Sequence, residues 1–175
     1  MVELGRTAAE LLVLIDQVAG SRRTVAEALR EREIRREYLA LVDGRPDART
    51  GTIDAPIGRD RRDRTVHSTA TDKPRAAVTH FEVEEELART TLLRVRLETG
   101  RTHQIRVHFA ALRHPCAGDQ TYGADPRLAA ALGLTRQWLH AVRLGFEHPD
   151  GGYVTYESPY PDDLASALDV IRVSH

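Results

Sequence analysis

The sequence predicts a mixed α/β (α+β) fold, in which a mainly antiparallel sheet is flanked by helices. Residues 77–84 and 90–98 alternate apolar and polar side chains and are joined by a short polar turn, which is typical of an antiparallel strand pair. Residues 102–112 then place apolar side chains at helical spacing. A second predicted strand pair, 138–148 and 153–157, precedes a closing amphipathic helix at 161–173.

The remaining elements follow from shorter apolar runs and from turn residues. In chain order we expect a buried strand at 11–15, a helix at 22–33 that Ser21 caps, a strand at 35–42 and a short edge strand at 52–57. An arginine-rich connection at 59–74 then surrounds a short strand at 65–70, and a helix that begins with a proline follows at 126–132. The apolar spacing predicts buried side chains at Phe81, Val83, Leu93, Val95, Leu97, Ile105, Phe109, Leu112, Leu164, Leu168 and Ile171. No repeat or linker is visible, so residues 1–175 are expected to form a single domain.

The composition is that of a globular protein, with 41% hydrophobic and 29% charged residues. The longest apolar run, 11–15, is too short to cross a bilayer, so no membrane association is expected. Cys116 is the only cysteine, which excludes an internal disulfide and favours a cytoplasmic location. Because His114 does not give it a zinc-ligand spacing, we expect Cys116 to be a buried thiol and no metal to be bound.

The net charge of −1 gives no indication of a nucleic-acid partner, but the kind of positive charge is informative. Lys73 is the only lysine among 25 basic residues. Arginine suits phosphate and base recognition through its planar fork, although codon usage in a GC-rich genome gives the same bias. Two arginine clusters, 30–36 and 59–64, are interleaved with acids, so a solvated and self-paired face is the alternative to a binding surface.

Several common sites are excluded by their missing motifs. The chain has neither G-x-G-x-x-G after a strand nor G-x-x-x-x-G-K-[ST], so a nucleotide-cofactor fingerprint is missing and no cofactor is expected. His103 and His108 lack the glutamate of H-E-x-x-H, which argues against a zinc hydrolase. No G-x-S-x-G elbow supplies a serine nucleophile.

The remaining candidates are polar residues at the ends of predicted elements: Tyr38, Arg101, Asp119, Tyr122 and His140. Arg101 precedes the helix at 102–112, where free backbone N–H groups and the helix dipole favour an anion. His103 and Arg106 lie on the polar face of that helix, and His103 alone would be a surface or capping residue. Plainer explanations exist, since a buried tyrosine needs only one hydroxyl partner and Arg101 can form a salt bridge. The residues by themselves indicate an α/β domain with a possible anion or RNA site.

Six short motifs occur in an order that resembles a known family. They are RREYLAL from Arg35, GRTHQIRVH from Gly100, HP from His114, GDQTYG from Gly118, LHA from Leu139 and FEHP from Phe146. Together they closely resemble the RluA-type RNA pseudouridine synthases over about residues 10–172. The run GRTHQIRVH is highly specific to that family.

The resemblance implies an enzyme that isomerises uridine to pseudouridine in ribosomal or transfer RNA without a metal or organic cofactor, acting on a base flipped out of its stack. In the family an aspartate attacks or deprotonates at the ribose, a tyrosine lies against the uracil and helps to remove a proton from C5, and an arginine holds the aspartate. By motif the tyrosine is Tyr38 and the arginine is Arg101. The expected RNA contacts are Arg61, Arg62, Arg64, His103 and Arg106.

The aspartate motif is where this sequence departs from the family. The family carries H-R-L-D-x-x-T-S-G directly before a strand that resembles 11–14, and in this register Gly5 occupies the position of the nucleophile. The N-terminal strand region and the S4 domain that often precede the motif are also expected to be absent. The chain is therefore predicted to be a truncated catalytic domain, with an exposed sheet edge that a homodimer would cover.

Three hypotheses follow from this departure. The first is an inactive pseudouridine synthase-like protein that keeps its RNA-binding surface. The second is a working synthase completed by a displaced acid or by another chain, and the third is a structural or dimerising remnant without an RNA role. Because the loss of a covalent nucleophile removes several orders of magnitude in rate, the physical argument favours the first for the isolated chain.

Overall fold

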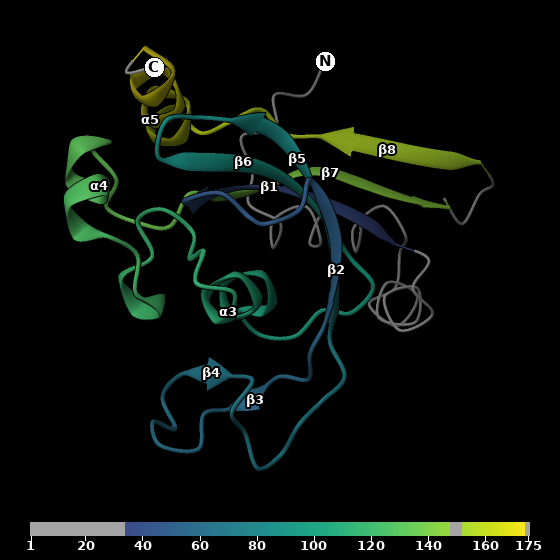
Figure 1. Ribbon diagram of the computed structural model, residues 1–175. Helices are drawn as coiled ribbons and strands as arrows, with labels where there is room; N and C mark the ends of the chain where they lie inside the picture. Colours follow the sequence, from purple (N-terminus) through teal and green to yellow (C-terminus); the bar gives the residue numbers. More distant parts are fainter. Residues whose placement is uncertain (1–33, 148–151, 174–175) are drawn as a thin grey trace.

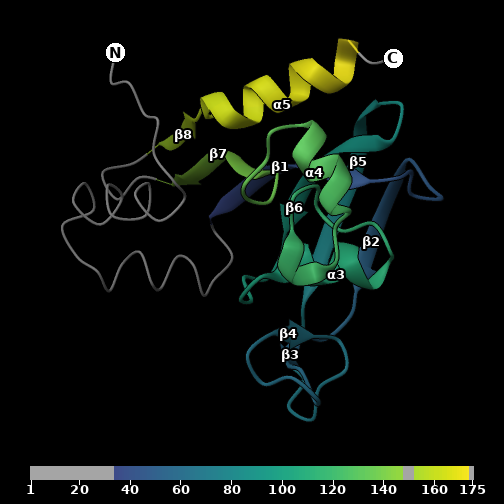
Figure 2. The same cartoon turned by 90° about the vertical axis from the view of Figure 1, so that its left-hand side faces the viewer.

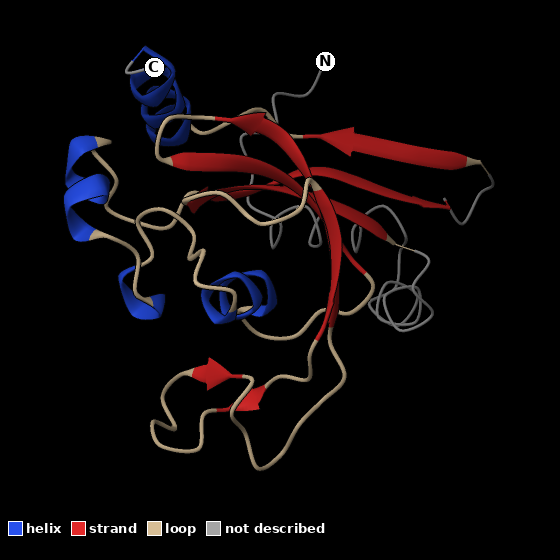
Figure 3. Cartoon of the chain, in the orientation of Figure 1, coloured by secondary structure: helices blue, strands red, loops and turns tan. Residues whose placement is uncertain are grey.

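The computed structural model describes residues 34–147 and 152–173. The predicted strand at 11–15, the predicted helix at 22–33 and position Gly5 lie outside these residues. In the described part, helices lie on both sides of a six-stranded antiparallel sheet (Figure 1 and Figure 3). The predicted mixed fold with a mainly antiparallel sheet is therefore confirmed.

The strand order in the sheet is β2-β5-β6-β1-β7-β8, and every neighbouring pair is antiparallel. The strands of this sheet are β1 (Arg35–Asp43), β2 (Thr50–Asp54), β5 (Val78–Glu86), β6 (Thr90–Leu97), β7 (Leu139–Glu147) and β8 (Tyr153–Glu157). The two predicted strand pairs appear as β5–β6 and β7–β8. The earlier strand β1 lies between these pairs and joins them into one sheet.

The helices are α3 (Gln104–Ala111), a short 3-10 turn η1 (Gln120–Tyr122), α4 (Pro126–Ala131) and α5 (Asp162–Val173). Figure 2 shows α5 running along one face of the sheet, with α3 on the opposite side. Asp125 caps α4 by accepting a hydrogen bond from the backbone N–H of Arg127, and Pro126 follows it at the first helical position.

The two faces of β1 contribute to two different cores. Ala40 and Val42 pack with Phe109 of α3, and the partly buried Tyr38 packs against the same cluster. Leu39 and Leu41 point the other way and pack with the buried face of α5. This division follows from the alternation of side chains along a strand, and it places Tyr38 on the α3 face.

A small two-stranded hairpin extends beyond α3, away from the main sheet (Figure 1). Its strands are β3 (Gly58–Arg59) and β4 (His67–Ser68), within the connection that the sequence predicted as polar and arginine-rich. Gly58 is needed where the hairpin folds back, because a Cβ there would lie 2.5 Å from the carbonyl oxygen of Lys73.

The predicted burial of one side chain, Leu112, is wrong. Leu112 was expected to be buried by helical spacing, but its exposed fraction is 44%. The helix α3 ends at Ala111 and Leu112 is its C-cap, so the helical spacing no longer directs this side chain toward the sheet. The other predicted core side chains are buried or pack against the buried clusters. Cys116 is buried as expected, and burial raises the pKa of its thiol to about 12.

Candidate functional site

Arg101 lies in the turn between β6 and α3, and the buried side chain of Gln104 holds this turn in place. The Gln104 Oε1 atom accepts hydrogen bonds from the Arg101 backbone N–H (3.0 Å) and from the Thr99 hydroxyl (2.8 Å). Its amide nitrogen donates to the Val78 carbonyl at the start of β5 (3.0 Å). The GRTHQ run therefore folds around its glutamine, which fixes the backbone of Arg101 against the sheet.

The guanidinium of Arg101 is held by the backbone rather than by an acid. Its Nε donates to the carbonyl oxygen of Ala76 at 2.9 Å. Among residues 34–147 and 152–173, no carboxylate lies within ion-pair distance of Arg101. The predicted salt-bridge alternative for this residue therefore finds no partner in the described part of the chain.

The turn and the hairpin β3–β4 together line a cavity of about 320 Å³. Its lining contains five cationic side chains: Arg59, Arg64, Lys73, Arg75 and Arg101. His67 also lines it, and burial together with the nearby Arg59 lowers the pKa of this imidazole. Because like charges lie close together there, the cavity favours an anionic ligand.

Of the arginines predicted to contact RNA on this connection, only Arg64 lines the cavity. Arg61 forms an exposed ion pair with Asp72, with 2.8 Å between its Nε and the carboxylate. Arg62 is exposed, and its backbone N–H donates to Asp60 in a turn. The alternative of a self-paired surface thus applies to Arg61, while Arg64 lies among cations that form no ion pair within the described part of the chain.

The residues Arg106, Asp119, Tyr122 and His103 form one polar cluster at the start of α3. Arg106 donates to both carboxylate oxygens of Asp119, at 2.6 and 2.7 Å, and its guanidinium lies 4.8 Å from the centroid of the Tyr122 ring. The Tyr122 hydroxyl is 3.0 Å from Nδ1 of His103 and accepts a 3.3 Å hydrogen bond from the backbone N–H of His67. This cluster attaches the hairpin β3–β4 to α3.

The charges within this cluster shift the pKa values of its members. Burial, followed by the positive charge of Arg106, lowers the pKa of His103. The hydrogen bonds to Asp119 raise the pKa of Arg106. His103 takes a left-handed conformation (φ 56°) at the N-cap of α3 without a side-chain capping bond. Its predicted position at the helix start is confirmed, and an RNA contact stays a prediction for both residues.

Tyr38 lies on the same side of the sheet as α3. Burial raises the pKa of its phenol, and the charge of Arg36 acts in the opposite direction. The pairing of β1 with β7 shifts register between Glu37 and Tyr38, so a β-bulge lies directly beside the tyrosine. Such bulges re-aim side chains and often occur next to active sites.

His140 is separated from the other candidate residues. It pairs with Leu39 across β1 and β7, and its ring contacts Tyr160 near α5 with 6.2 Å between ring centroids. Burial lowers the pKa of this histidine. The structure therefore places Tyr38, Arg101, Asp119 and Tyr122 on the α3 side and His140 on the α5 side.

The sequence motifs assign no individual role to Arg36, Arg59, Lys73 or Arg75, although Arg36 and Arg59 lie in the arginine clusters 30–36 and 59–64. Arg36 could have been found, because it lies two residues before Tyr38 in a predicted strand and must share its face. Lys73 and Arg75 gave no comparable signal, since only the folding of the hairpin brings them to Arg101.

Within the described ranges, no group of three or more His, Cys, Asp or Glu side chains is arranged to hold a metal ion. None of the described helices is long and apolar enough to span a membrane.

The antiparallel sheet, with Tyr38 on its central strand and the GRTHQ turn at its end, defines an RNA pseudouridine synthase-like catalytic fold. The profile of the family described as RNA pseudouridylate synthase matches residues 16–111. The chain belongs to this family and is of its RluA type. The match begins after position 5, so it does not test the predicted position of the family's aspartate.

Bacterial relatives are similar to this chain over most of its length. An uncharacterised RNA pseudouridine synthase of Mycobacterium bovis is 55% identical over 146 residues, which cover 83% of this chain and 47% of the relative. The ribosomal large subunit pseudouridine synthase D of Nitrosomonas europaea is 43% identical over 166 residues, covering 92% of this chain and 48% of the relative. The chain thus spans about half the length of these relatives.

Solved structures of this family have a similar fold. Human RNA pseudouridylate synthase domain containing 1 matches with a TM-score of 0.70 and 27% identity, over 84% of this chain and 65% of the human chain. Human RNA pseudouridylate synthase domain containing 4 has the same TM-score at 23% identity, over 86% of this chain and 67% of the human chain, and supports the fold alone.

Proposed function

We propose that this chain is an RNA-binding pseudouridine synthase-like protein that does not isomerise uridine on its own. The observation that carries the RNA-binding part is the cationic cavity beside Arg101. Its five basic side chains line one concave site, and none of them has an ion pair with a described carboxylate. Clustered guanidinium and ammonium groups bind the phosphates of RNA and release counterions from them.

Tyr38 supports a uridine as the base next to this phosphate-binding site. Burial raises the pKa of Tyr38, so the side chain is a neutral phenol at neutral pH. A flat phenol offers an apolar face to a uracil ring and a hydroxyl for hydrogen bonding. Arg101 and Tyr38 come from motifs shared with the RluA-type family, and in this proposal they keep the family's roles.

The lack of activity is proposed from position 5, where the family register has its nucleophilic aspartate and this chain has glycine. Glycine has no side chain that could attack or deprotonate the ribose. The Arg101 guanidinium, whose counterpart in the family holds that aspartate, donates to the Ala76 carbonyl instead. Removing a nucleophile lowers a rate by several orders of magnitude, and neighbouring groups seldom restore it.

RNA binding is tested by fluorescence anisotropy with a labelled stem-loop RNA that carries uridines in its loop, titrated at several salt concentrations. We expect the affinity to fall as the salt concentration rises. Arg101→Ala should reduce the slope of the logarithm of the binding constant against the logarithm of the salt concentration by about 0.7–0.9 per lost phosphate contact. Arg61→Ala should weaken binding less, because Asp72 already pairs with Arg61. Arg172→Ala is the matched control, since Arg172 pairs with Glu85 on the α5 side. Absence of binding at low salt would instead favour a structural or dimerising remnant.

The catalytic part is tested by tritium release from RNA labelled at C5 of uridine. We expect no release above background by the isolated chain. Release that disappears in Tyr38→Phe would contradict the proposed inactivity and favour a synthase with a displaced acid. Release only after another protein chain is added would show that the catalytic carboxylate comes from that chain.

A further inference from the structure

Arg36 is a second arginine on the site side of the sheet, and its side-chain Nε lacks a partner among the described residues. It lies on β1 two residues before Tyr38, so both side chains project from the α3 face. Its Nε is buried and has no hydrogen-bond partner. No described carboxylate forms an ion pair with its guanidinium, a situation that folded proteins generally avoid.

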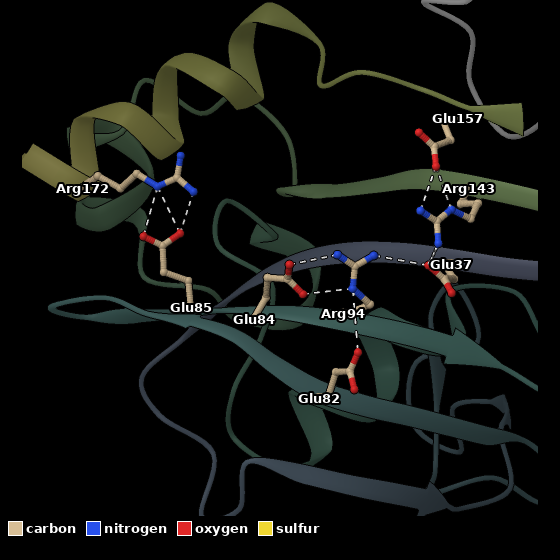
Figure 4. Close-up of polar contacts among 8 residues, drawn as sticks. All are labelled: Glu37, Glu82, Glu84, Glu85, Arg94, Arg143, Glu157 and Arg172. Atoms are coloured by element: carbon tan, nitrogen blue, oxygen red, sulfur yellow. Dashed lines mark hydrogen bonds and ion pairs between the residues drawn. The ribbon is translucent and has the colours of Figure 1, made fainter.

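Other arginines of the same sheet contrast with Arg36. Figure 4 shows that Arg94 is surrounded by Glu37, Glu82 and Glu84, with two 2.9 Å hydrogen bonds to Glu84. Arg143 likewise donates to Glu157 from two of its nitrogens, at 3.0 and 2.8 Å. The fold thus supplies carboxylates to these arginines on the α5 face.

The head of Arg36 reaches the turn that carries Arg101. A Cβ placed on Gly100 would lie 2.7 Å from Nη1 of Arg36, so the guanidinium packs directly against this glycine. Gly100 also lines the cationic cavity. Arg36 therefore lies between Tyr38 and the Gly100–Arg101 turn, which are the two places where the proposed function puts the base and the phosphate-binding site.

A guanidinium with a buried and unpaired Nε is costly for the folded chain unless an anion arrives to pair with it. We propose that Arg36 binds a backbone phosphate of the RNA next to the uridine that faces Tyr38, and so fixes the position of that nucleotide. This inference rests on the proposed RNA binding and assigns one of its contacts. The planar fork of arginine suits this role, because it pairs with two phosphate oxygens at once.

The test compares Arg36→Gln, Arg36→Lys and Arg96→Gln in the stem-loop anisotropy titration, with thermal unfolding measured in parallel. We expect Arg36→Gln to weaken RNA binding about tenfold. It should also reduce the slope of the logarithm of the binding constant against the logarithm of the salt concentration by about 0.7–0.9. Arg36→Lys should recover part of the affinity, since a lysine keeps the charge without the fork. Arg96 is exposed on the opposite face of the same sheet, so Arg96→Gln should bind like the parent chain.

Thermal unfolding separates this role from a structural one. Removing an unpaired charge should leave the Tm of Arg36→Gln equal to or above that of the parent chain. A lowered Tm together with weaker binding would overturn the inference, because Arg36 would then be supporting the fold. If the parent chain binds RNA and Arg36→Gln binds equally well with the same salt dependence, the inference is also overturned. Failure of the parent chain to bind would instead refute the proposed function itself.

Discussion

His108 is fully buried, and both of its ring nitrogens have partners in a chain of hydrogen bonds that starts at the site. Its Nε2 lies 2.8 Å from the Ala55 carbonyl oxygen, which can only accept, so this nitrogen carries the proton. Nδ1 therefore accepts from the Thr79 hydroxyl at 2.8 Å, and the Thr79 oxygen accepts from Gln104 at 3.0 Å. This arrangement suits a neutral imidazole, and burial lowers the pKa of His108.

This geometry predicts the direction in which stability depends on pH. The folded-state pKa of His108 lies below the ordinary value of 6.5, because burial outweighs the opposing effects of the Ala55 carbonyl and Asp54. Above about pH 6.5 both states are neutral and the stabilisation is fully present. As the pH falls, the unfolded chain takes up a proton that the folded chain refuses, so stability is lost from about pH 6.5 down to the folded pKa. His67, His103 and His140 act in the same direction.

Urea unfolding at about pH 7.5 and about pH 5.5 measures this effect. The parent chain should lose free energy of unfolding between the two values, and His108→Gln, although less stable at both, should lose less of it. An equal loss in the parent and in His108→Gln would contradict the assignment to this residue.

At the scale of elements, the loop from Gly118 to Gly123 determines how α3, the hairpin and β7 meet. Gly118 has a φ of 82°, and a Cβ there would lie 2.3 Å from the Arg136 carbonyl oxygen. The next residue, Asp119, pairs with Arg106 and also accepts from the backbone N–H of Tyr122. A shift of this loop would therefore disturb the polar cluster that attaches the hairpin.

Gly118→Ala is expected to destabilise the fold by about 2–4 kcal/mol, through backbone strain and a backbone clash that no side chain can relieve. Gly133→Ala is the matched control, because Gly133 has a similar φ of 66° but nothing within 4 Å of the added Cβ. That control should cost only about 1 kcal/mol. Equal free energies of unfolding for the two variants would show that the close approach to Arg136 contributes nothing.

The elements themselves were largely predictable from the sequence, and their order in the sheet was not. β5 and β6 alternate in sequence, and this period of two indicates which of their side chains share a face, whereas the register shift between Val83 and Glu85 is not visible in that pattern. The position of β1 between β6 and β7 depends on pairings between residues distant in the sequence, as in Tyr38 with Val95 and Ala141. The motif resemblance identified Tyr38 and Arg101. It assigned no role to Arg36, whose buried Nε has no partner among the described residues.

At the scale of the whole molecule, a net charge of −1 conceals a separation of charge between the two sides of the sheet. Cations that have no ion pair with a carboxylate of the described residues line the cavity on the α3 side. On the α5 side glutamates surround the arginines, and Glu37 is shared between Arg94 and Arg143 (Figure 4). This separation makes the proposed RNA binding to the α3 side compatible with a weakly acidic chain.

The core beneath α5 depends on Trp138, which is the only tryptophan and is fully buried. It packs with side chains from β1, from the α4 region and from α5. Its indole N–H donates to the Leu164 carbonyl at 2.8 Å, which attaches the first turn of α5 to the start of β7. Trp138 is therefore the residue at which the layers of the α5 side meet.

Trp138→Ala is expected to lower the free energy of unfolding by about 3–5 kcal/mol, since it leaves a large cavity and removes the indole hydrogen bond to Leu164. Trp138→Phe keeps most of the apolar volume and loses the hydrogen bond, so it should cost about 1–2 kcal/mol. Urea titration followed by far-UV circular dichroism compares all three chains without relying on tryptophan fluorescence. If Trp138→Ala unfolded within about 1 kcal/mol of the parent chain, α5 would have to be held mainly by its ion pairs with Arg136 and Glu85. Exposed pairs of that kind contribute too little for this outcome to be expected.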